Sequence, residues 1–194
     1  EIVEGRHDFV EWPLRQQLTN KFNADCAAGI LNAPDPAFDP ETDKEIQRTY
    51  NAGNHPAGKR ENKRHLQKTL GLIQDDRAAL FFWPSRLDPV QKGCKLLSEA
   101  FYGIISDFWD MNLQVVFVAN GDFQQTFRDI VNQHGYHNRV AVCDFNESLE
   151  HLAYAAADFI LMPSLFEPCG LPQMIAPIYG ALPVAHDTGG IHDT

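Results

Sequence analysis

The stretch Met162-Pro-Ser-Leu-Phe-Glu-Pro-Cys-Gly-Leu171 decides how this chain is interpreted. A short apolar run at 159–162 leads into a turn punctuated by proline and glycine, and a helical pattern follows. A strand that leads into a helix in this way exposes unpaired backbone N–H groups, which can bind an anion. The carboxylate of Glu167 is unexpected at such a site, unless the ligand is phosphorylated at one end and neutral and hydroxyl-rich at the other. A nucleotide sugar has both kinds of end.

Five apolar segments along the chain have the length of β-strands, at 79–83, 113–119, 140–143, 159–162 and 182–185. Amphipathic helical patterns separate them. Apolar strands that alternate with such helices are typical of a parallel sheet covered on both faces. The sequence therefore predicts a Rossmann-like α/β domain, in which ligands bind beyond the carboxyl ends of the strands.

The first 55 residues differ from this regular pattern. They mix short apolar patches with turn signals and contain a proline-rich stretch at 33–40. We expect 1–55 to be an interlobe connector and lead-in segment, and 56–194 to be a domain that binds a nucleotide sugar. The chain starts without Met and stops just after a strand–loop–helix pattern begins, so we expect a piece of a longer protein whose domain is truncated at its C-terminus.

Composition excludes several classes of protein. The chain has 194 residues, enough for one domain, and its formal net charge of −10 argues against a nucleic-acid partner. No apolar run is long enough to cross a membrane, and no secretion signal is present. The four cysteines are far apart and form no CxxC pair, which predicts reduced thiols and a cytoplasmic protein.

The loop after the first predicted strand carries two cations, Arg86 and Lys92. A diphosphate leaving group gains negative charge as a glycosidic bond breaks, and two cations at the sheet edge can stabilise that charge without a metal. On spacing alone, the alternative is a pair of solvated surface cations.

The loops after the other strands carry weaker signals. Gly121 would let the backbone approach a ligand and Asp122 would cap the next helix, although a plain turn explains both. Phe145 either stacks on a nucleobase or packs beside the sheet. The turn Thr188-Gly-Gly190 either cradles a phosphate through its N–H groups or simply connects a strand to a helix.

Together these segments resemble the bacterial glycogen synthases and plant starch synthases, which are retaining glucosyltransferases with the GT-B fold. Motifs that match in order along nearly the whole chain include Ser85-Arg-Leu87, Gln91-Lys-Gly93, Phe166-Glu-Pro-Cys-Gly-Leu171 and Thr188-Gly-Gly190. The third of these is highly specific, whereas the scattered glycine pairs are not. The resemblance implies the donor-binding C-terminal lobe of a GT-B fold, incomplete at its C-terminus.

The resemblance also implies roles for single residues. Arg86 and Lys92 would hold the diphosphate, and Glu167 would position the glucosyl ring and balance its positive charge. Phe145 would stack on the base. The remaining substrate-binding residues that it implies are Gly121, Asp122, Cys169, Gly170, Leu171, Thr188, Gly189 and Gly190.

The implied activity is transfer of glucose from ADP-glucose or UDP-glucose to the non-reducing end of an α-1,4-glucan, with retention and without a cofactor or metal. The acceptor would bind through an absent N-terminal lobe, so we expect the fragment alone to be inactive. A plant protein of this kind would be plastidial. Two alternatives stay open: another retaining GT-B transferase, such as a sucrose-forming one, and a nucleotide-binding module without catalysis.

The chain departs from the family pattern around the phosphates. Arg86 and Lys92 are six positions apart, one more than usual, so the loop must bulge. Leu165 stands where the family often has arginine, and His186 and Asp187 stand where basic residues often precede Thr-Gly-Gly. These departures reduce the positive charge and predict weaker donor binding.

Overall fold

The computed structural model describes residues 2, 3, 5 and 10–194. The chain divides into two compact units, Glu1–Asn32 and Ala33–Thr194. The smaller unit contains one helix, α1 (Trp12–Asn23), which has a proline in its first turn and no buried residue. The predicted connector at 1–55 includes positions 1, 4 and 6–9, which lie outside the described residues, and its functional boundary stays a prediction.

The larger unit is built on a sheet of five parallel strands. These are β1 (Leu80–Trp83), β2 (Gln114–Val118), β3 (Val140–Cys143), β4 (Phe159–Met162) and β5 (Leu182–Ala185). Their order is β3-β2-β1-β4-β5, so the first strand is central and the chain crosses from one side of it to the other. Each predicted strand agrees with the observed one to within one residue at either end.

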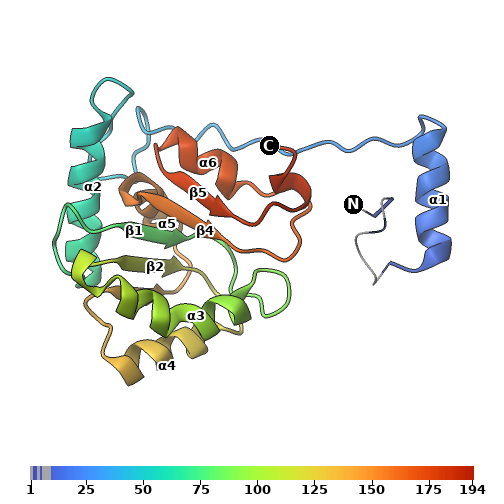
Figure 1. Ribbon diagram of the computed structural model, residues 1–194. Coiled ribbons are helices and arrows are strands. Elements are labelled where there is room, and N and C mark those ends of the chain that lie inside the picture. Colours follow the sequence, from blue (N-terminus) through green and yellow to red (C-terminus); the bar gives the residue numbers. More distant parts are fainter. Residues whose placement is uncertain (1, 4, 6–9) are drawn as a thin grey trace. The chain divides into compact units, whose positions relative to one another are not determined.

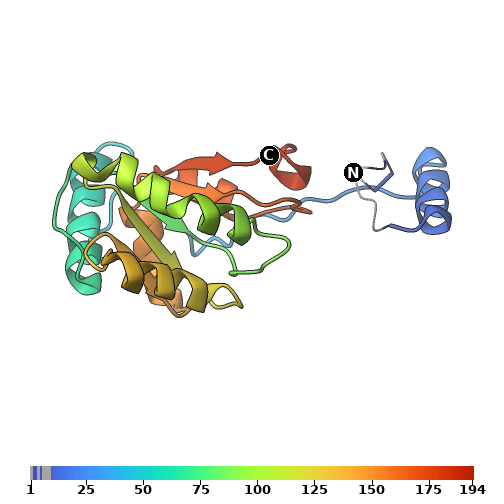
Figure 2. The ribbon, with the colours of Figure 1, turned by 60° about the horizontal axis from the view of Figure 1, so that its bottom comes forward.

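Helices cover both faces of this sheet (Figures 1 and 2). One face is covered by α3 (Cys94–Asp107) and α4 (Gln124–His134), and the other by α5 (Glu147–Ala156) and α6 (Pro172–Ile178), with α2 (His55–Leu70) packed against α5. Two short 3-10 helices follow α3 and β5, namely η1 (Trp109–Met111) and η2 (Gly189–Ile191). The predicted Rossmann-like α/β fold is confirmed.

Alternate side chains of the strands β1 to β4 enter two separate cores, as the twofold period of a strand requires, whereas β5 is exposed at every position. In β1, Phe82 joins the core under α5 and α6, while Trp83 joins the core under α3 and α4. The second core is aromatic, with the rings of Phe117 and Phe127 stacked 4.5 Å apart. Burial of each such side chain contributes about 1.5 to 3 kcal/mol, which fixes both helix layers on the sheet.

Helix ends show where local prediction holds and where it does not. Asn146, a residue type favoured at helix starts, caps α5: its side chain accepts a hydrogen bond from the Leu149 N–H at 2.9 Å. The predicted cap at Asp122 is wrong: α4 begins at Gln124, and no side chain caps it. The cause is a turn closed by the Gln124 N–H on the Gly121 carbonyl (3.1 Å), which keeps Asp122 outside the helix. Among the helices described, none combines the length and apolar character needed to cross a bilayer.

Candidate functional site

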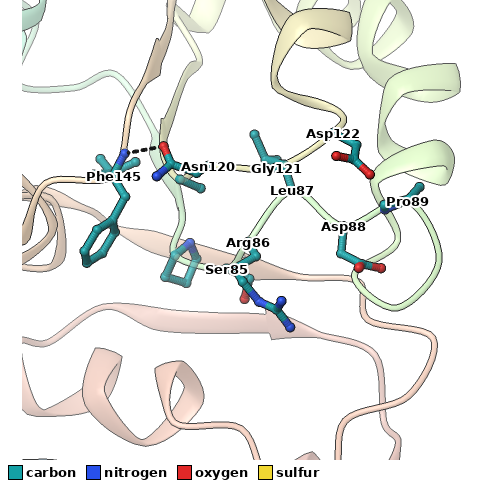
Figure 3. A pocket seen from close by; sticks show the side chains of 12 residues that line it. Ser85, Arg86, Leu87, Asp88, Pro89, Asn120, Gly121, Asp122 and Phe145 are labelled. Atoms are coloured by element: carbon teal, nitrogen blue, oxygen red, sulfur yellow. Dashed lines mark hydrogen bonds between the residues drawn. The ribbon is translucent and has the colours of Figure 1, made fainter.

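Three loops meet beyond the carboxyl ends of β1, β2 and β3 and enclose a cavity of about 590 Å³ (Figure 3). Four of the predicted site residues line it, namely Arg86, Gly121, Asp122 and Phe145. This is the edge of a parallel sheet where ligands are expected.

Direct backbone contacts hold the first two loops together. The Leu87 N–H donates to the Asn120 carbonyl at 3.0 Å, and the Phe123 N–H donates to the Leu87 carbonyl at 3.2 Å. Gly121 has a φ of +148° and lies so close to Leu87 that a Cβ would overlap its main chain. A glycine is therefore needed here for loop packing, whether or not a ligand is bound.

Phe145 projects into the cavity from the third loop. Its ring is not buried in the core, since the residue is 53% exposed, and its N–H donates to the Asn120 side-chain oxygen at 3.0 Å. Next to it, a hydrogen bond from Arg128 lowers the pKa of Asp144 and fixes the start of the loop. Figure 3 shows the ring of Phe145 and the guanidinium of Arg86 extending to the same side of the loops.

Arg86 is an unpaired cation at this edge. It is exposed, and it forms no ion pair with any carboxylate in the part of the chain that the structure describes. The loop after it turns around Asp88, whose carboxylate accepts hydrogen bonds from the N–H groups of Val90 (2.9 Å) and Gln91 (2.7 Å). These two bonds lower the pKa of Asp88.

Lys92 and Glu167 form a second group, beside the cavity and not in its lining. The Lys92 ammonium is ion-paired with Oε2 of Glu167, and the two side chains are only 12% and 8% exposed. The Ser164 hydroxyl donates to the same oxygen at 3.3 Å. A carboxylate this buried needs a cationic partner, and Lys92 supplies it.

The loops after β4 and β5 close around this pair. The Gly190 N–H donates to the Glu167 carbonyl at 2.7 Å, so it is engaged within the protein rather than directed outward. A Cβ on Gly190 would overlap the main chain of Cys169. Thr188 is buried, and Gly189 begins η2.

The loop after β1 connects the two groups. Its Gln91 carbonyl accepts from the Leu165 N–H at 2.8 Å, and a Cβ on Gly93 would overlap the Pro163 carbonyl. The same loop contacts Asn120 at its other end, as described above. All the predicted site residues therefore lie at one edge of the sheet, in two adjoining groups.

Several side chains that hold the site were not predicted from the sequence. Gln173 donates through Nε2 to the carbonyls of Cys169 (2.9 Å) and Gly170 (3.1 Å), which fixes the turn before α6. Ser164 and Asn120 have similar supporting roles. The sequence signals that could have indicated these roles were positional. Gln173 lies three residues after the turn at Gly170, and Asn120 and Ser164 lie two residues after the ends of β2 and β4. Among the described residues, no group of three or more histidines, cysteines or acidic side chains is placed to hold a metal ion.

Comparison with known proteins gives a consistent result. The sequence model of the family described as "Glycosyl transferases group 1" matches residues 78–194. A glycogen synthase of Bacillus licheniformis is 41% identical over 172 residues, which cover 88% of this chain and 34% of the relative. A glycogen synthase of Bacillus cereus is 38% identical over 180 residues, covering 91% and 36%.

A solved structure extends the similarity to three dimensions. The catalytic domain of starch synthase IV from Arabidopsis thaliana, bound to ADP and acarbose, matches with a TM-score of 0.79 at 36% identity. The match covers 93% of this chain and 37% of that one. The chain thus spans about a third of the length of the relatives it matches.

Proposed function

The chain belongs to the group 1 glycosyl transferases, and we therefore propose that it is the donor-binding lobe of a glycogen or starch synthase. The whole enzyme would transfer glucose from ADP-glucose, or from UDP-glucose, to the non-reducing end of an α-1,4-glucan with retention of configuration. The similarity to glycogen synthases and to starch synthase IV supports this choice over a sucrose-forming transferase. We also propose that the glucan acceptor binds through another lobe of the enzyme and that the protein is cytoplasmic.

One observation carries the proposal. An unpaired guanidinium, Arg86, and an exposed aromatic ring, Phe145, face the same cavity beyond the carboxyl ends of the strands. In a chain of net charge −10, an unpaired cation beside an exposed aromatic ring suits a ligand with a phosphate group and a flat base.

The buried pair beside the cavity supplies the rest of the proposed chemistry. Arg86 would bind the diphosphate first. Lys92 would then leave the Glu167 carboxylate and form an ion pair with the phosphate instead. Both cations would stabilise the negative charge that develops as the diphosphate leaves. Glu167, released from its ion pair, would face the positive charge that develops on the glucosyl ring.

The remaining predicted residues have mainly positioning roles in this proposal. Gly121 lets two loops meet, and Gly190 ties the loop after β5 to Glu167. Cys169, Gly170 and Leu171 form the turn that places Glu167 ahead of α6.

Calorimetry tests the proposal directly. The chain should bind ADP or UDP, and their glucose conjugates, and the preferred base identifies the donor. Arg86→Ala should weaken binding at least tenfold, because a charge-assisted hydrogen bond contributes about 1.5 to 3 kcal/mol. Arg77→Ala, at an exposed arginine just before β1 at the other end of the sheet, is the matched control and should change nothing. Absence of nucleotide binding, or an Arg86→Ala variant that binds normally, would overturn the proposal.

A further inference from the structure

Asn120 and Phe145 lie side by side where β2 and β3 end. The register of these strands pairs Val118 with Cys143, so the residues two positions further along each chain segment, Asn120 and Phe145, are neighbours as well. Both line the cavity and both are exposed. Phe145 is the proposed stacking partner of a nucleobase, and Asn120 is the polar side chain next to it.

One hydrogen bond fixes which end of the Asn120 amide faces the cavity. The Phe145 N–H donates to Oδ1 of Asn120 at 3.0 Å. A main-chain N–H can only donate, so its partner must be the amide oxygen, and the NH2 group must occupy the other end of the side chain. In Figure 3 this nitrogen lies on the side of Asn120 toward which the Phe145 ring and the Arg86 guanidinium extend. The NH2 group is therefore directed at the cavity, beside the exposed ring.

The NH2 group of Asn120 is also an available donor. Among the described residues, no carbonyl or carboxylate accepts a hydrogen bond from its nitrogen. The other amide nearby is already used, since Nε2 of Gln124 donates to the carbonyls of Ala119 (3.0 Å) and Cys143 (3.3 Å) and to the Asp144 carboxylate (2.8 Å). Asn120 is thus the side-chain amide of this part of the cavity that a ligand can engage.

The support of Asn120 is rigid. The three hydrogen bonds of Gln124 join the ends of β2 and β3, and the Ala119 N–H donates to the Cys143 carbonyl at 3.2 Å. The Asn120 carbonyl accepts from the Leu87 N–H at 3.0 Å, which ties the residue to the loop after β1 as well. A donor held in this way binds a ligand with little loss of conformational entropy.

A donor in a fixed position can distinguish one base from another. A base that stacks on Phe145, with its diphosphate at Arg86, has both its plane and its glycosidic end fixed. Adenine has two fused rings and uracil has one, so their hydrogen-bond acceptors lie at different distances from the glycosidic bond. Because a hydrogen bond requires a narrow range of distance and angle, a single fixed NH2 group can match an acceptor of one base but not of both.

We propose that the side-chain NH2 group of Asn120 donates a hydrogen bond to the base of the bound nucleotide and thereby sets the preference between adenine and uracil. This inference rests on the proposed function, which supplies the nucleotide. Asn120 then has two roles, since its oxygen holds the loop of Phe145 and its nitrogen selects the base that stacks there.

Calorimetric titration of the full chain with ADP, UDP and inorganic pyrophosphate tests the proposal. We expect the wild type to bind one nucleotide at least fivefold more tightly than the other. Asn120→Ser removes the NH2 group but keeps a hydroxyl that can accept from a main-chain N–H. In this variant the Kd of the preferred nucleotide should rise about fivefold, as expected for the loss of one neutral hydrogen bond. The preference should fall below twofold, and the Kd for pyrophosphate should not change.

Asn120→Asp covers the case in which Asn120→Ser fails to fold, which circular dichroism would show. Aspartate keeps the shape of the side chain and the acceptor for the Phe145 N–H, but it replaces the NH2 donor with an acceptor. Its negative charge weakens every diphosphate ligand, so the ratio of the Kd for the preferred nucleotide to the Kd for pyrophosphate is compared, and this ratio should rise at least fivefold. Asn132→Asp makes the same charge change at an exposed position of α4 outside the cavity lining, and as the matched control it should leave all three Kd values unchanged.

The outcomes separate this inference from the proposed function. The inference is overturned if the wild type does not distinguish ADP from UDP, or if neither Asn120 variant alters the preference. It is also overturned if both variants weaken pyrophosphate as much as the preferred nucleotide, or weaken both nucleotides by the same factor, because the side chain would then act on the phosphate, the ribose or the loop. In all these cases nucleotides still bind and the proposed function stands. If the wild type binds neither nucleotide, the proposed function itself is contradicted, and the inference with it.

Discussion

Replacement of Lys92 by methionine is the sharpest test of the buried ion pair. Methionine keeps roughly the length of the side chain. Among the described residues, it leaves the Glu167 carboxylate, 8% exposed, with the 3.3 Å hydrogen bond from Ser164 alone. Loss of one partner of a buried pair costs about 3 to 5 kcal/mol, since the other charge is left uncompensated. Urea unfolding followed by circular dichroism measures this as a loss of unfolding free energy.

Helix α3, which begins two residues after Lys92, provides a control for this experiment. Lys95 pairs with Glu99 at 3.9 Å, but these side chains are 76% and 66% exposed. Lys95→Met should cost about 0.5 kcal/mol or less, because exposed pairs contribute little. The double variant Lys92→Met/Glu167→Gln should recover about 2 kcal/mol relative to Lys92→Met alone. Equal costs for Lys92→Met and Lys95→Met would refute the reasoning.

Nucleotide affinity of the same variants extends the test to the proposed mechanism. If Glu167 holds Lys92 in the empty site, Glu167→Gln frees the cation and removes a negative charge next to the diphosphate. We expect the Kd for ADP to be about fivefold lower in Glu167→Gln, which corresponds to a binding free energy more favourable by roughly 1 kcal/mol. Weaker ADP binding in this variant would contradict the proposed exchange of Lys92 between carboxylate and phosphate.

Three further changes test other parts of the fold. Gly190→Ala places a methyl group against the main chain of Cys169 and should lower the unfolding free energy by about 1 to 3 kcal/mol in a urea titration. Gly103→Ala in α3 is the contrasting change, because a Cβ there meets nothing within 4 Å, and it should raise the unfolding free energy by about 0.5 to 1 kcal/mol. Tyr179→Phe removes the hydroxyl that donates to the buried Asp43 carboxylate and should cost about 1.5 to 3 kcal/mol by the same measure. Burial raises the pKa of the Cys94 thiol to about 12, so this thiol should resist alkylation at pH 8.5 until the chain unfolds, as mass spectrometry would show. Because the pKa of Cys94 is higher in the folded than in the unfolded chain, the stability that the protonated thiol contributes is lost as the pH rises above the ordinary pKa of 9.0.

The strands were predictable because their signal is local. A run such as Leu80–Trp83 is apolar at every position, as burial on both faces of a parallel sheet requires, and no helical period competes with it. Helix starts were less predictable. Asp122 was expected to cap a helix that in fact begins at Gln124, and α2 begins at His55 with Pro56 in its first turn, where proline is tolerated.

The position of the site was predictable from the sheet, but its internal pairing was not. Parallel topology places every loop after a strand at one edge, so Arg86 and Phe145 were expected to lie near each other. The partner of Glu167 lies 75 positions earlier in the chain, and no local pattern specifies it. That pairing depends on how closely two loops approach, which Gly93 permits by packing directly against Pro163.

The ion pair also explains why a carboxylate can stand where the sequence predicts an anion site. An acidic side chain there would repel a phosphate group if it remained free. In the structure, Lys92 neutralises Glu167, and Arg86 is the cation in a cavity lining that also contains Asp88 and Asp122. In the proposed function, Arg86 would therefore make the first contact with a diphosphate. If a diphosphate binds as proposed, Lys92 would have two competing acceptors, and its transfer to the phosphate would leave the carboxylate available for a positive centre. In the proposed mechanism, Lys92 would compensate the charge of Glu167 before the donor binds and the sugar would compensate it during transfer, which would be a physical reason for placing both residues next to the same loop.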